Sequence, residues 1–364
     1  MPGPTRTIFI TGGTGLVGSH VVEEALARGH KVRVLVRGSS DTRQLDAWGV
    51  EKVLGDLEDT NALAQGVNGA DWVINCAAKV GDWGDLDDFR RLNVDALQLL
   101  LDAATKAKVS RFVHVSSLGV YEGRDHHGTD ETTPPALNSL DAYTRSKTEA
   151  ELLVLAYRPE GPATMLPYVE EALKKSTVPA AERKLDVAIV RPGFIYGERD
   201  RTVLPKLLTR LRSKVFAYFG SGQQALNCIY VKNLAYGIFL AAETPAASGQ
   251  VYNLTDGEPV TKRQFVGTVA KLAGLTEPTR KIPRPIAYWL AKGMERRARR
   301  KKATEPPLIN MARYKFLGLN LDYSIAKART QLGYQPPFTT QQGLERAVAE
   351  LLAAEKANSA ASNA

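Results

Sequence analysis

Cysteine is scarce in this 364-residue sequence, which contains only Cys76 and Cys228. Two cysteines cannot build a disulfide framework, and no CxxC or His-rich spacing indicates a metal site, so we expect no metal. We interpret both residues as small, buried apolar side chains. This use of cysteine is typical of a protein in a reducing cytoplasm.

Long apolar runs are absent as well. The longest, Leu234–Ala242, is far shorter than the ~20 residues that span a bilayer, and it contains a glycine. Met1–Pro4 leads directly into a strand-like run, without the charged and apolar segments of a secretory signal. We therefore expect a cytoplasmic protein, with at most peripheral contact to a membrane.

Basic residues are concentrated in one place. The net charge is +9, and six positive charges lie within Arg296–Lys302, so the rest of the chain carries a net charge of +3. No second basic stripe or series of stacking aromatic residues accompanies this cluster. The sequence therefore predicts no nucleic-acid partner.

The basic cluster ends a segment, 285–302, that has apolar residues at helical spacing. These are Ile286, Trp289, Leu290 and Met294. An apolar face with a tryptophan beside a cationic end can lie on an anionic membrane surface. The alternative is a surface helix whose apolar face packs on its own lobe while its charges stay in water. The sequence leaves both interpretations open.

Short β-rich runs alternate with longer helical runs in the N-terminal half. The strand candidates are Thr7–Thr11, Lys31–Val36, Val53–Leu54, Trp72–Ala77, Arg111–Ser117 and Val187–Val190. A helix over Leu16–Arg28 follows the first of them. Strands separated by helices indicate βαβ units and a parallel sheet covered on both faces. We therefore predict an α/β fold, a Rossmann-type doubly wound parallel sheet with a smaller C-terminal substrate lobe.

The regular alternation of strands and helices ends after the sixth predicted strand, where shorter elements and many Pro and Gly residues follow. We assign residues 1–198 to an NADP-binding Rossmann domain and residues 199–357 mainly to a substrate-binding lobe. Within the first domain, residues 158–184 form an insertion with a short helix near Tyr168–Lys175. The small, polar residues 358–364 form a flexible tail.

A glycine-rich turn, Thr11–Gly18, joins the first strand to the first helix. Glycines in such a turn let the backbone approach a pyrophosphate, whose charge is stabilised at the helix N-terminus. The expected cofactor contacts here are Gly12, Thr14, Gly15, Leu16, Val17 and Gly18. A purely structural turn is the alternative, but the flanking strand and helix favour a dinucleotide.

Arg37 follows the second strand, where NAD-binding proteins place an acidic residue for the ribose 2′-hydroxyl. Its guanidinium can instead bind a 2′-phosphate through two hydrogen bonds and stack on adenine. Ser39, Ser40 and Arg43 could add donors. We therefore favour NADP(H) over NAD. The alternative is a solvated Arg37, with Asp41 reaching back to the ribose.

Residues after the next three strands complete the expected cofactor site. They are Asp56 and Leu57 after the third strand, Ala77, Ala78 and Lys79 after the fourth, and Ser116 at the end of the fifth. Asp56 and Leu57 are placed to meet the adenine edge, although Asp56 can equally cap the helix that starts near Thr60. The alanines leave room beside the cofactor.

Tyr143 and Lys147 are predicted to share one face of a helix capped by Ser139 or Asp141. A phenol has an ordinary pKa of ~10, and a nearby ammonium or nicotinamide cation lowers it by about 1–3 pH units. The phenol would then exchange protons near neutral pH. Ser117 ends the fifth strand, and its hydroxyl can hold a substrate oxygen during reaction.

Together these features resemble the extended short-chain dehydrogenase/reductases. The resemblance spans roughly residues 6–350. The motifs that carry it are Thr11–Gly18, Asn75–Ala78, Asn93-Val94, Ser116-Ser117, Tyr143 with Lys147, and Arg191–Gly197.

The resemblance implies a role for each matching position. Tyr143 would be the general acid/base, Lys147 would modulate it and hold the nicotinamide ribose, and Ser117 would be the catalytic hydroxyl. Asn93 would brace the sheet and the active site. The carboxamide side of the nicotinamide would be lined by Pro192, Gly193 and Ile195.

Two later motifs are similar to those of the 3β-hydroxysteroid dehydrogenase-like branch, namely Asn227–Ala235 and Leu321–Ala328 with Leu332–Pro336. Nucleotide-sugar epimerases and dehydratases often carry an arginine near the place of Asn227, which this chain lacks. The resemblance also implies that a homodimer can form through a pair of helices.

We therefore expect an NADP(H)-dependent oxidoreductase. It would reduce the carbonyl, or oxidise the hydroxyl, of a hydrophobic substrate such as a sterol or a long-chain β-keto acid. The alternatives are a nucleotide-sugar epimerase or dehydratase and a non-catalytic NADP-sensing module.

Overall fold

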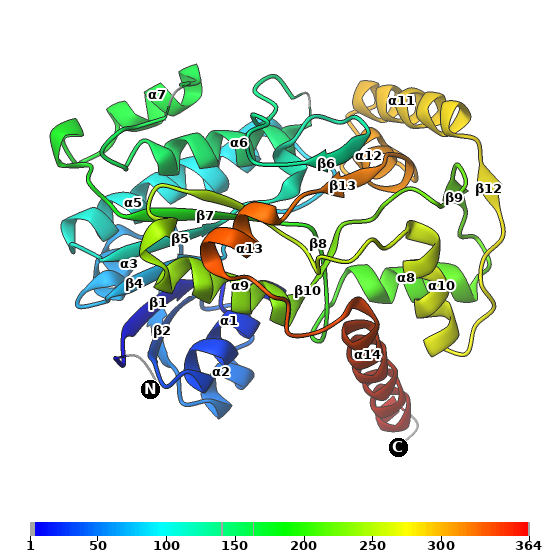
Figure 1. Ribbon diagram of the computed structural model, residues 1–364, viewed down its shortest axis with the longest axis horizontal. Coiled ribbons are helices and arrows are strands. Elements are labelled where there is room, and N and C mark those ends of the chain that lie inside the picture. Colours follow the sequence, from blue (N-terminus) through cyan, green and yellow to red (C-terminus); the bar gives the residue numbers. More distant parts are fainter. Residues whose placement is uncertain (1–3, 140, 163, 363–364) are drawn as a thin grey trace.

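A central sheet of seven parallel strands organises the structure, a computed structural model that describes residues 4–139, 141–162 and 164–362. The strand order is β11-β7-β5-β4-β1-β2-β3. The bounds are β1 (Thr7–Thr11), β2 (Lys31–Val36), β3 (Glu51–Leu54), β4 (Trp72–Asn75), β5 (Arg111–Val115), β7 (Val187–Pro192) and β11 (Val251–Leu254). Helices cover both faces (Figure 1), so the predicted Rossmann-type doubly wound α/β fold is confirmed.

The sheet extends beyond the part of the chain in which we predicted it. The six predicted strands are present, and β4 and β5 each end two residues earlier than predicted. The seventh strand, β11, pairs with β7 in the register Tyr252 to Val190. It comes from residues 199–357, so the chain returns to the Rossmann sheet after it has begun to build the substrate lobe.

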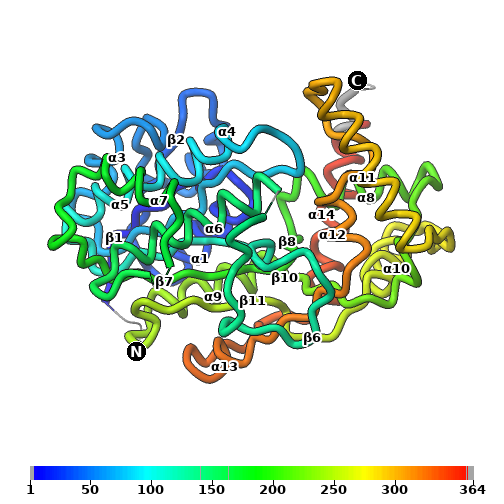
Figure 2. The backbone as a smooth tube through the Cα atoms, turned by 90° about the horizontal axis from the view of Figure 1, so that it is seen from above, coloured from blue at the N-terminus to red at the C-terminus, as the bar shows by residue number. Residues whose placement is uncertain are grey.

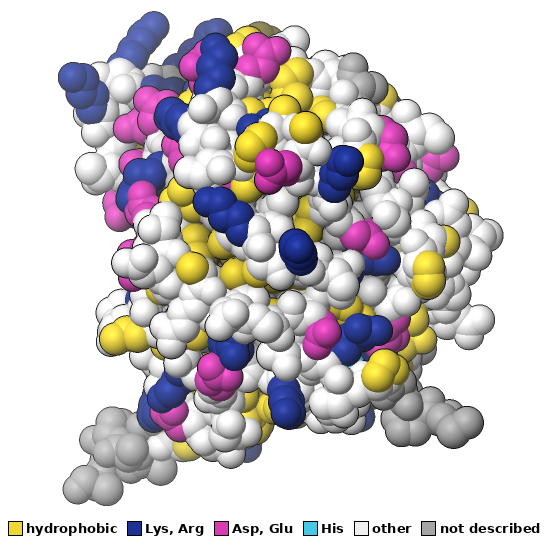
Figure 3. Space-filling view, turned by 90° about the vertical axis from the view of Figure 1, so that its left-hand side faces the viewer, with side chains coloured by type: hydrophobic (Ala, Val, Ile, Leu, Met, Phe, Trp, Pro, Cys, Tyr) yellow, Lys and Arg dark blue, Asp and Glu magenta, His cyan; other side chains and the backbone are white. Residues whose placement is uncertain are grey.

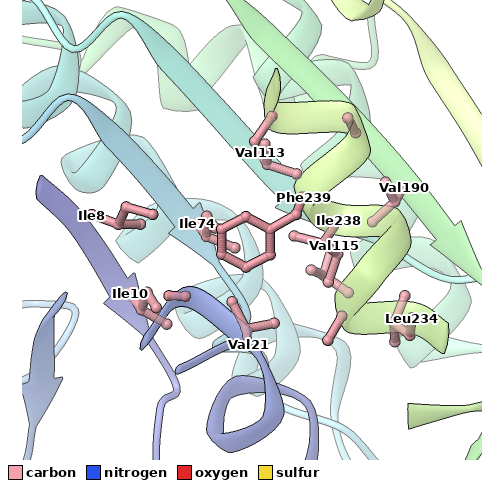
Figure 4. Close-up of a cluster of buried hydrophobic side chains, with 14 of the residues drawn as sticks. Ile8, Ile10, Val21, Ile74, Val113, Val115, Val190, Leu234, Ile238 and Phe239 are labelled. Carbon is pink, nitrogen blue, oxygen red and sulfur yellow. The ribbon is translucent and has the colours of Figure 1, made fainter. Parts of the chain in front are cut away.

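Two layers of helices enclose the sheet. They are α1 (Leu16–Ala27), α2 (Arg43–Ala47), α3 (Thr60–Val67), α4 (Leu86–Arg90), α5 (Ala96–Lys106), α6 (Ala142–Leu155) and α9 (Val231–Glu243). Figure 4 shows Val21 of α1 and Phe239 of α9 packed with Ile8, Ile10 and Ile74 of the sheet. The opposite face packs on α3, α5 and α6. Burial on both faces explains why these strands are almost continuously apolar.

The substrate lobe has its own apolar core. Its helices are α8 (Val203–Arg212), α10 (Lys262–Leu272), α11 (Arg284–Arg300), α12 (Met311–Gly318), α13 (Ala326–Leu332) and α14 (Thr340–Ser362). Its short strand pairs are β8 (Phe194–Tyr196) with β10 (Cys228–Tyr230), β9 (Tyr218–Phe219) with β12 (Lys281–Ile282), and β6 (His126–Thr129) with β13 (Leu321–Tyr323). Tyr196, Tyr230 and Phe265 fill the core where α8, α10 and α14 meet. Residues 358–362 continue α14, and residues 363–364 of the expected tail lie outside the described residues.

The insertion 158–184 lies on the Rossmann half. It contains α7 (Pro167–Lys174), which begins and ends one residue before the helix predicted near Tyr168–Lys175. Tyr168 donates its hydroxyl to Asp95 at 2.8 Å, and the Arg90 guanidinium stacks 4.1 Å above its ring. These contacts hold α7 against the segment from Arg90 to Asp95. Helix α7 also packs on α6, at the end of the molecule opposite α11 (Figures 1 and 2). Figure 3 views that end, where Lys and Arg side chains are interspersed with Asp and Glu.

No helix within the described part of the chain is long and apolar enough to cross a bilayer.

Candidate active site

The glycine turn between β1 and α1 is closely packed. Gly12 has a φ of +71°, and a Cβ there would lie 2.8 Å from the backbone nitrogen of Ala77. A Cβ on Gly18 would lie 2.1 Å from the carbonyl oxygen of Gly12. Only glycine fits such contacts without a shift of the backbone. The turn thereby brings the start of α1 against the end of β4.

The N-terminus of α1 is suited to an anion. Its N-cap residue, Gly15, makes no side-chain cap, and its first turn contains no acidic residue. The first N–H groups of a helix have no partner within the helix, and they carry its partial positive charge. The turn therefore fits the pyrophosphate of a dinucleotide.

The other predicted cofactor residues follow the carboxyl ends of parallel strands and so share one edge of the sheet. They are Arg37 after β2, Asp56 and Leu57 after β3, Ala77, Ala78 and Lys79 after β4, Ser116 after β5, and Pro192, Gly193 and Ile195 at the end of β7 and in β8. The strand order reverses between β4 and β1, which is where ligands bind in such sheets. Asp56 caps no helix, because Asp59 accepts the first N–H bonds of α3.

The segment after β2 leaves Arg37 exposed. The backbone N–H of Arg37 donates to Ser40 Oγ at 3.2 Å. Arg43, one of the expected extra donors, instead donates to both oxygens of Asp41, at 2.9 and 2.7 Å. These bonds hold the pKa of Asp41 well below its usual range. Asp41 is therefore already paired, whereas the Arg37 guanidinium is free among the described residues to meet a ligand.

The predicted proton-transfer residues meet where β5 ends and α6 begins. Asp141 caps α6 by accepting a hydrogen bond from the Thr144 N–H at 2.9 Å, which selects one of the two predicted caps. Tyr143 lies in the first turn of the helix. Its ring and the Ser117 hydroxyl both border Gly119, and Ser117 Oγ accepts the Gly119 N–H at 2.9 Å. The hydroxyl and the phenol thus lie beside each other.

Lys147 is buried one helical turn beyond Tyr143, at 2% exposure. Its ammonium donates to the carbonyl of Val115 at 2.8 Å. Burial lowers the pKa of Lys147 to about 8, although the nearby Glu151 carboxylate raises it.

The pKa of Tyr143 differs from the prediction. Burial raises it above the ordinary value for a phenol, and the nearby Ser117 hydroxyl lowers it only in part. In this structure burial outweighs the lowering that we expected from the Lys147 ammonium, which donates to the Val115 carbonyl. The phenol is consequently protonated at neutral pH.

A buried ion pair under the site did not emerge from the sequence. Arg191 of β7 donates to both oxygens of Glu151 on α6, with a shortest distance of 2.6 Å, and both side chains are at most 5% exposed. Ser116 donates to the same carboxylate at 2.5 Å, and Arg191 also donates to Tyr121 at 2.8 Å. Ser116 therefore belongs to a structural network that joins β5, α6 and β7.

Asn93 braces the site, as the family resemblance implies. It lies in a π-helical turn, Arg91–Asp95, between α4 and α5. Its amide accepts the Lys79 N–H at 2.7 Å and donates to the Lys79 carbonyl at 3.0 Å. It also donates to Ser146 at 3.0 Å. These bonds connect the loop after β4 with the Tyr143 helix.

Lys315 of α12 also reaches the site, and sequence reasoning missed it. Its ammonium donates to the carbonyls of Gly119 and Tyr121, each at 2.8 Å. Burial lowers the pKa of Lys315. The short helical turn that follows Ser117, Leu118–Val120, is thus held by a cation from the substrate lobe.

We expect Lys315→Met to lower kcat about tenfold with little change in KM, since losing bonds from a charged donor frees the loop that carries Ser117. Steady-state kinetics would separate the two constants. Lys315→Arg should restore part of kcat, and Lys327→Met, which removes a bond to Gln250, serves as the control. An equal fall in kcat in Lys315→Met and Lys327→Met would contradict a positioning role for Lys315.

One hollow of about 500 Å³ is lined by residues of α10, including Thr268 and Lys271. None of its lining residues belongs to the predicted site.

The fold and this arrangement of Ser, Tyr and Lys define a Rossmann-type protein of the short-chain dehydrogenase class. The NAD dependent epimerase/dehydratase family matches residues 8–255. The chain therefore belongs to that family, and within it to the 3β-hydroxysteroid dehydrogenase-like branch.

Individual relatives match almost the whole chain. It is 33% identical over 347 residues to a 4-hydroxy-2-methyl-3-oxo-4-farnesyl-3,4-dihydroquinoline-1-oxide ketoreductase of Stigmatella aurantiaca, covering 93% of this chain and 94% of the relative. It is 34% identical over 351 residues to a 3 beta-hydroxysteroid dehydrogenase/Delta 5→4-isomerase of Mycobacterium tuberculosis, covering 93% and 88%. The crystal structure of gox2253 superposes with a TM-score of 0.75 at 28% identity, covering 96% and 99%.

Proposed function

We propose that this protein is an NADP(H)-dependent ketoreductase acting on a hydrophobic carbonyl substrate. The observation that carries the proposal is the grouping of Ser117, Tyr143 and the buried Lys147 at the same edge of the sheet as the glycine turn. A binding module that only senses the dinucleotide would not require this grouping.

NADPH, when bound, would supply the hydride that reduces the carbonyl carbon. Ser117 would donate a hydrogen bond to the substrate oxygen, where negative charge develops. Tyr143 would give its phenolic proton to that oxygen. Lys147, buried one helical turn beyond Tyr143 and held by the Val115 carbonyl, would bind the nicotinamide ribose.

The reductive direction is proposed because one of the relatives reported above is named a ketoreductase. The same phenol would give its proton to the substrate oxygen in reduction and take it back in oxidation, so its protonation alone does not select a direction.

NADP(H) is proposed over NAD(H) because Arg37 lies exposed after β2 while Asp41 is occupied by Arg43. A planar guanidinium can bind a 2′-phosphate through two charge-assisted hydrogen bonds. A free carboxylate at this place would instead favour the ribose hydroxyl of NAD.

We expect Arg37→Asp to reduce kcat/KM for NADPH about 10- to 150-fold, because hydrogen bonds between charged groups contribute ~1.5–3 kcal/mol each. The NADH value should hold or rise, since the new carboxylate can bind the ribose hydroxyl, so the ratio of the two constants is the measurement. Lys206→Asp makes the same change of charge on the exposed face of α8 and should leave the ratio unaltered. An unchanged ratio in Arg37→Asp would overturn the cofactor assignment.

A hydrophobic substrate is proposed because the relatives reported above are named for ketone and steroid chemistry. The absence of an arginine at Asn227 agrees with this, since the Asn227 amide donates to the Tyr323 carbonyl at 3.2 Å and offers no cation to a diphosphate. The test follows NADPH absorbance with steroid, long-chain β-keto and aromatic ketones. Conversion of a UDP-sugar without net NADPH use, and no turnover of any ketone, would favour a nucleotide-sugar epimerase instead.

A further inference from the structure

Helix α11 turns its larger apolar side chains outward. Ile286, Trp289 and Leu290 are 53%, 64% and 44% exposed. They recur at the spacing of one helix face. Figure 1 shows α11 at the upper edge of the molecule. The surface of a monomeric protein seldom gathers exposed residues of this size along one face without a partner.

The inner face of α11 is made of small residues. Ala287 and Ala291 are fully buried where α11 packs on α12. Tyr288 adds an edge-to-face contact with Tyr314 at 5.4 Å. One interpretation of the sequence was that the apolar face of segment 285–302 packs on its own lobe. That interpretation is wrong for Ile286, Trp289 and Leu290, which are exposed. The alanines allow close helix packing and leave those side chains in solvent.

The same outward face becomes cationic toward the end of the helix. Arg296, Arg297 and Arg300 continue the spacing of Ile286 and Leu290, and all three are exposed. Within the described residues none of the three has a carboxylate at ion-pair distance, unlike their neighbour Arg299, which pairs with Glu295. Lys301 and Lys302 follow directly, so the cations lie together and are free to meet an anionic surface.

Two loops add exposed apolar residues beside this face. Leu308 and Val80 are 67% and 72% exposed. Their loops are joined because Arg313 binds Asp82 at 2.5 Å and also donates to the Leu308 carbonyl at 2.8 Å. Trp83 donates to the Ala303 carbonyl at 2.9 Å, which attaches the loop after β4 to the end of α11. These loops thus lie near the basic end of α11. The outward face of α11 with the basic cluster that ends it is hereafter called the α11 surface.

We propose that the α11 surface docks on an anionic phospholipid bilayer. Exposed apolar side chains with a tryptophan enter the interface between headgroups and acyl chains, and an adjacent basic cluster binds the lipid phosphates. A second copy of the chain fits less well, because among the described residues the outward face of α11 supplies no carboxylate that could pair with the basic cluster of the other copy. A nucleic acid would leave the apolar half of the face unused.

Binding to vesicles tests the proposal, and it does so whether or not the protein reduces ketones. The full chain is sedimented with vesicles of phosphatidylcholine, with and without phosphatidylglycerol. We expect binding only to the anionic vesicles, and weaker binding at high salt. Arg296, Arg297 and Arg300 changed together to Gln should lower the partition coefficient about fivefold for each cation removed.

The apolar half is tested by changing Ile286, Trp289 and Leu290 together to Ser, which should lower the partition coefficient about tenfold or more. The matched controls remove exposed residues elsewhere and should bind as the native chain does. They are Lys175, Lys206 and Lys271 changed to Gln, and Leu54 with Val215 changed to Ser. Circular dichroism confirms that each variant is folded.

Three outcomes would overturn the proposal. The first is equal recovery with neutral and anionic vesicles, or equal recovery of the native chain and both α11 variants. The second is dimerisation that the apolar variant abolishes, without vesicle binding. The third is binding to duplex DNA but not to vesicles, which would assign the cations to a nucleic acid.

Discussion

The Tyr143→Phe variant should lose ketone reduction by about 100- to 10,000-fold in kcat, the range over which a positioned acid or base contributes to catalysis. The substitution removes the phenolic proton, and it leaves the ring that contacts Phe89 at 6.3 Å between centroids. The fold and the glycine turn do not depend on that hydroxyl. NADPH binding, measured by fluorescence, should therefore persist while turnover disappears.

Tyr168→Phe is the matched control for this loss. It deletes a phenolic hydroxyl that donates to Asp95 on the outer side of the Rossmann half, and it should leave kcat unchanged. Retention of ketone reduction by Tyr143→Phe would mean that another group supplies the proton. Loss of both turnover and NADPH binding would indicate damage to the fold instead.

Glu151→Gln should lower the free energy of unfolding by about 3–5 kcal/mol, because it leaves the Arg191 guanidinium as an uncompensated buried charge. Ser116 would also lose its charged acceptor. Chemical denaturation followed by circular dichroism measures the change. Glu171→Gln removes an exposed pair with Lys174 and should cost less than about 1 kcal/mol.

A double variant separates the ion pair from simple loss of packing. Glu151→Leu combined with Arg191→Met replaces both charges by apolar side chains of similar size, and it should be more stable than either single variant. If the free energy of unfolding of Glu151→Gln lies within ~1 kcal/mol of that of the native chain, the ion-pair network does not contribute the stability that its burial implies.

The sequence was sufficient to predict the sheet and the place of the site. β1 and β2 coincide with their predicted ranges, because a strand buried on both faces is a continuous apolar run. The glycine turn was recognised because its spacing follows from steric contacts, such as that between Gly18 and Gly12, which no other residue tolerates. The Asp141 cap and the helix α7 follow from equally local rules.

Features that depend on contacts distant in sequence were not predicted. Lys315 reaches the loop after Ser117 from a helix almost 200 residues later, and no local pattern marks it. The pair of Arg191 with Glu151 forms only once β7 lies beside α6. β11 is four residues long and follows α9 in the chain, so no local pattern shows that it joins the central sheet beside β7.

The electrostatics of Tyr143 illustrate the same limit. The spacing of Tyr143 and Lys147 was read correctly as a shared helix, yet the pKa of the phenol depends on burial and on which acceptor the ammonium chooses. The spacing of two residues in the sequence indicates neither the burial of the phenol nor the acceptor of the ammonium. The bond to the Val115 carbonyl is visible only in three dimensions, and so is the burial that raises the pKa of the phenol.

Transfer of deuterium from NADPH to the substrate carbon tests the central claim most directly. NADPH labelled at the transferable position of the nicotinamide is mixed with the protein and a hydrophobic ketone that it consumes, and the product is analysed by mass spectrometry. We predict one deuterium on the carbinol carbon for each NADPH oxidised, with no labelled product from Tyr143→Phe. Product without deuterium, or conversion of a UDP-sugar with no net oxidation of NADPH, would contradict the account.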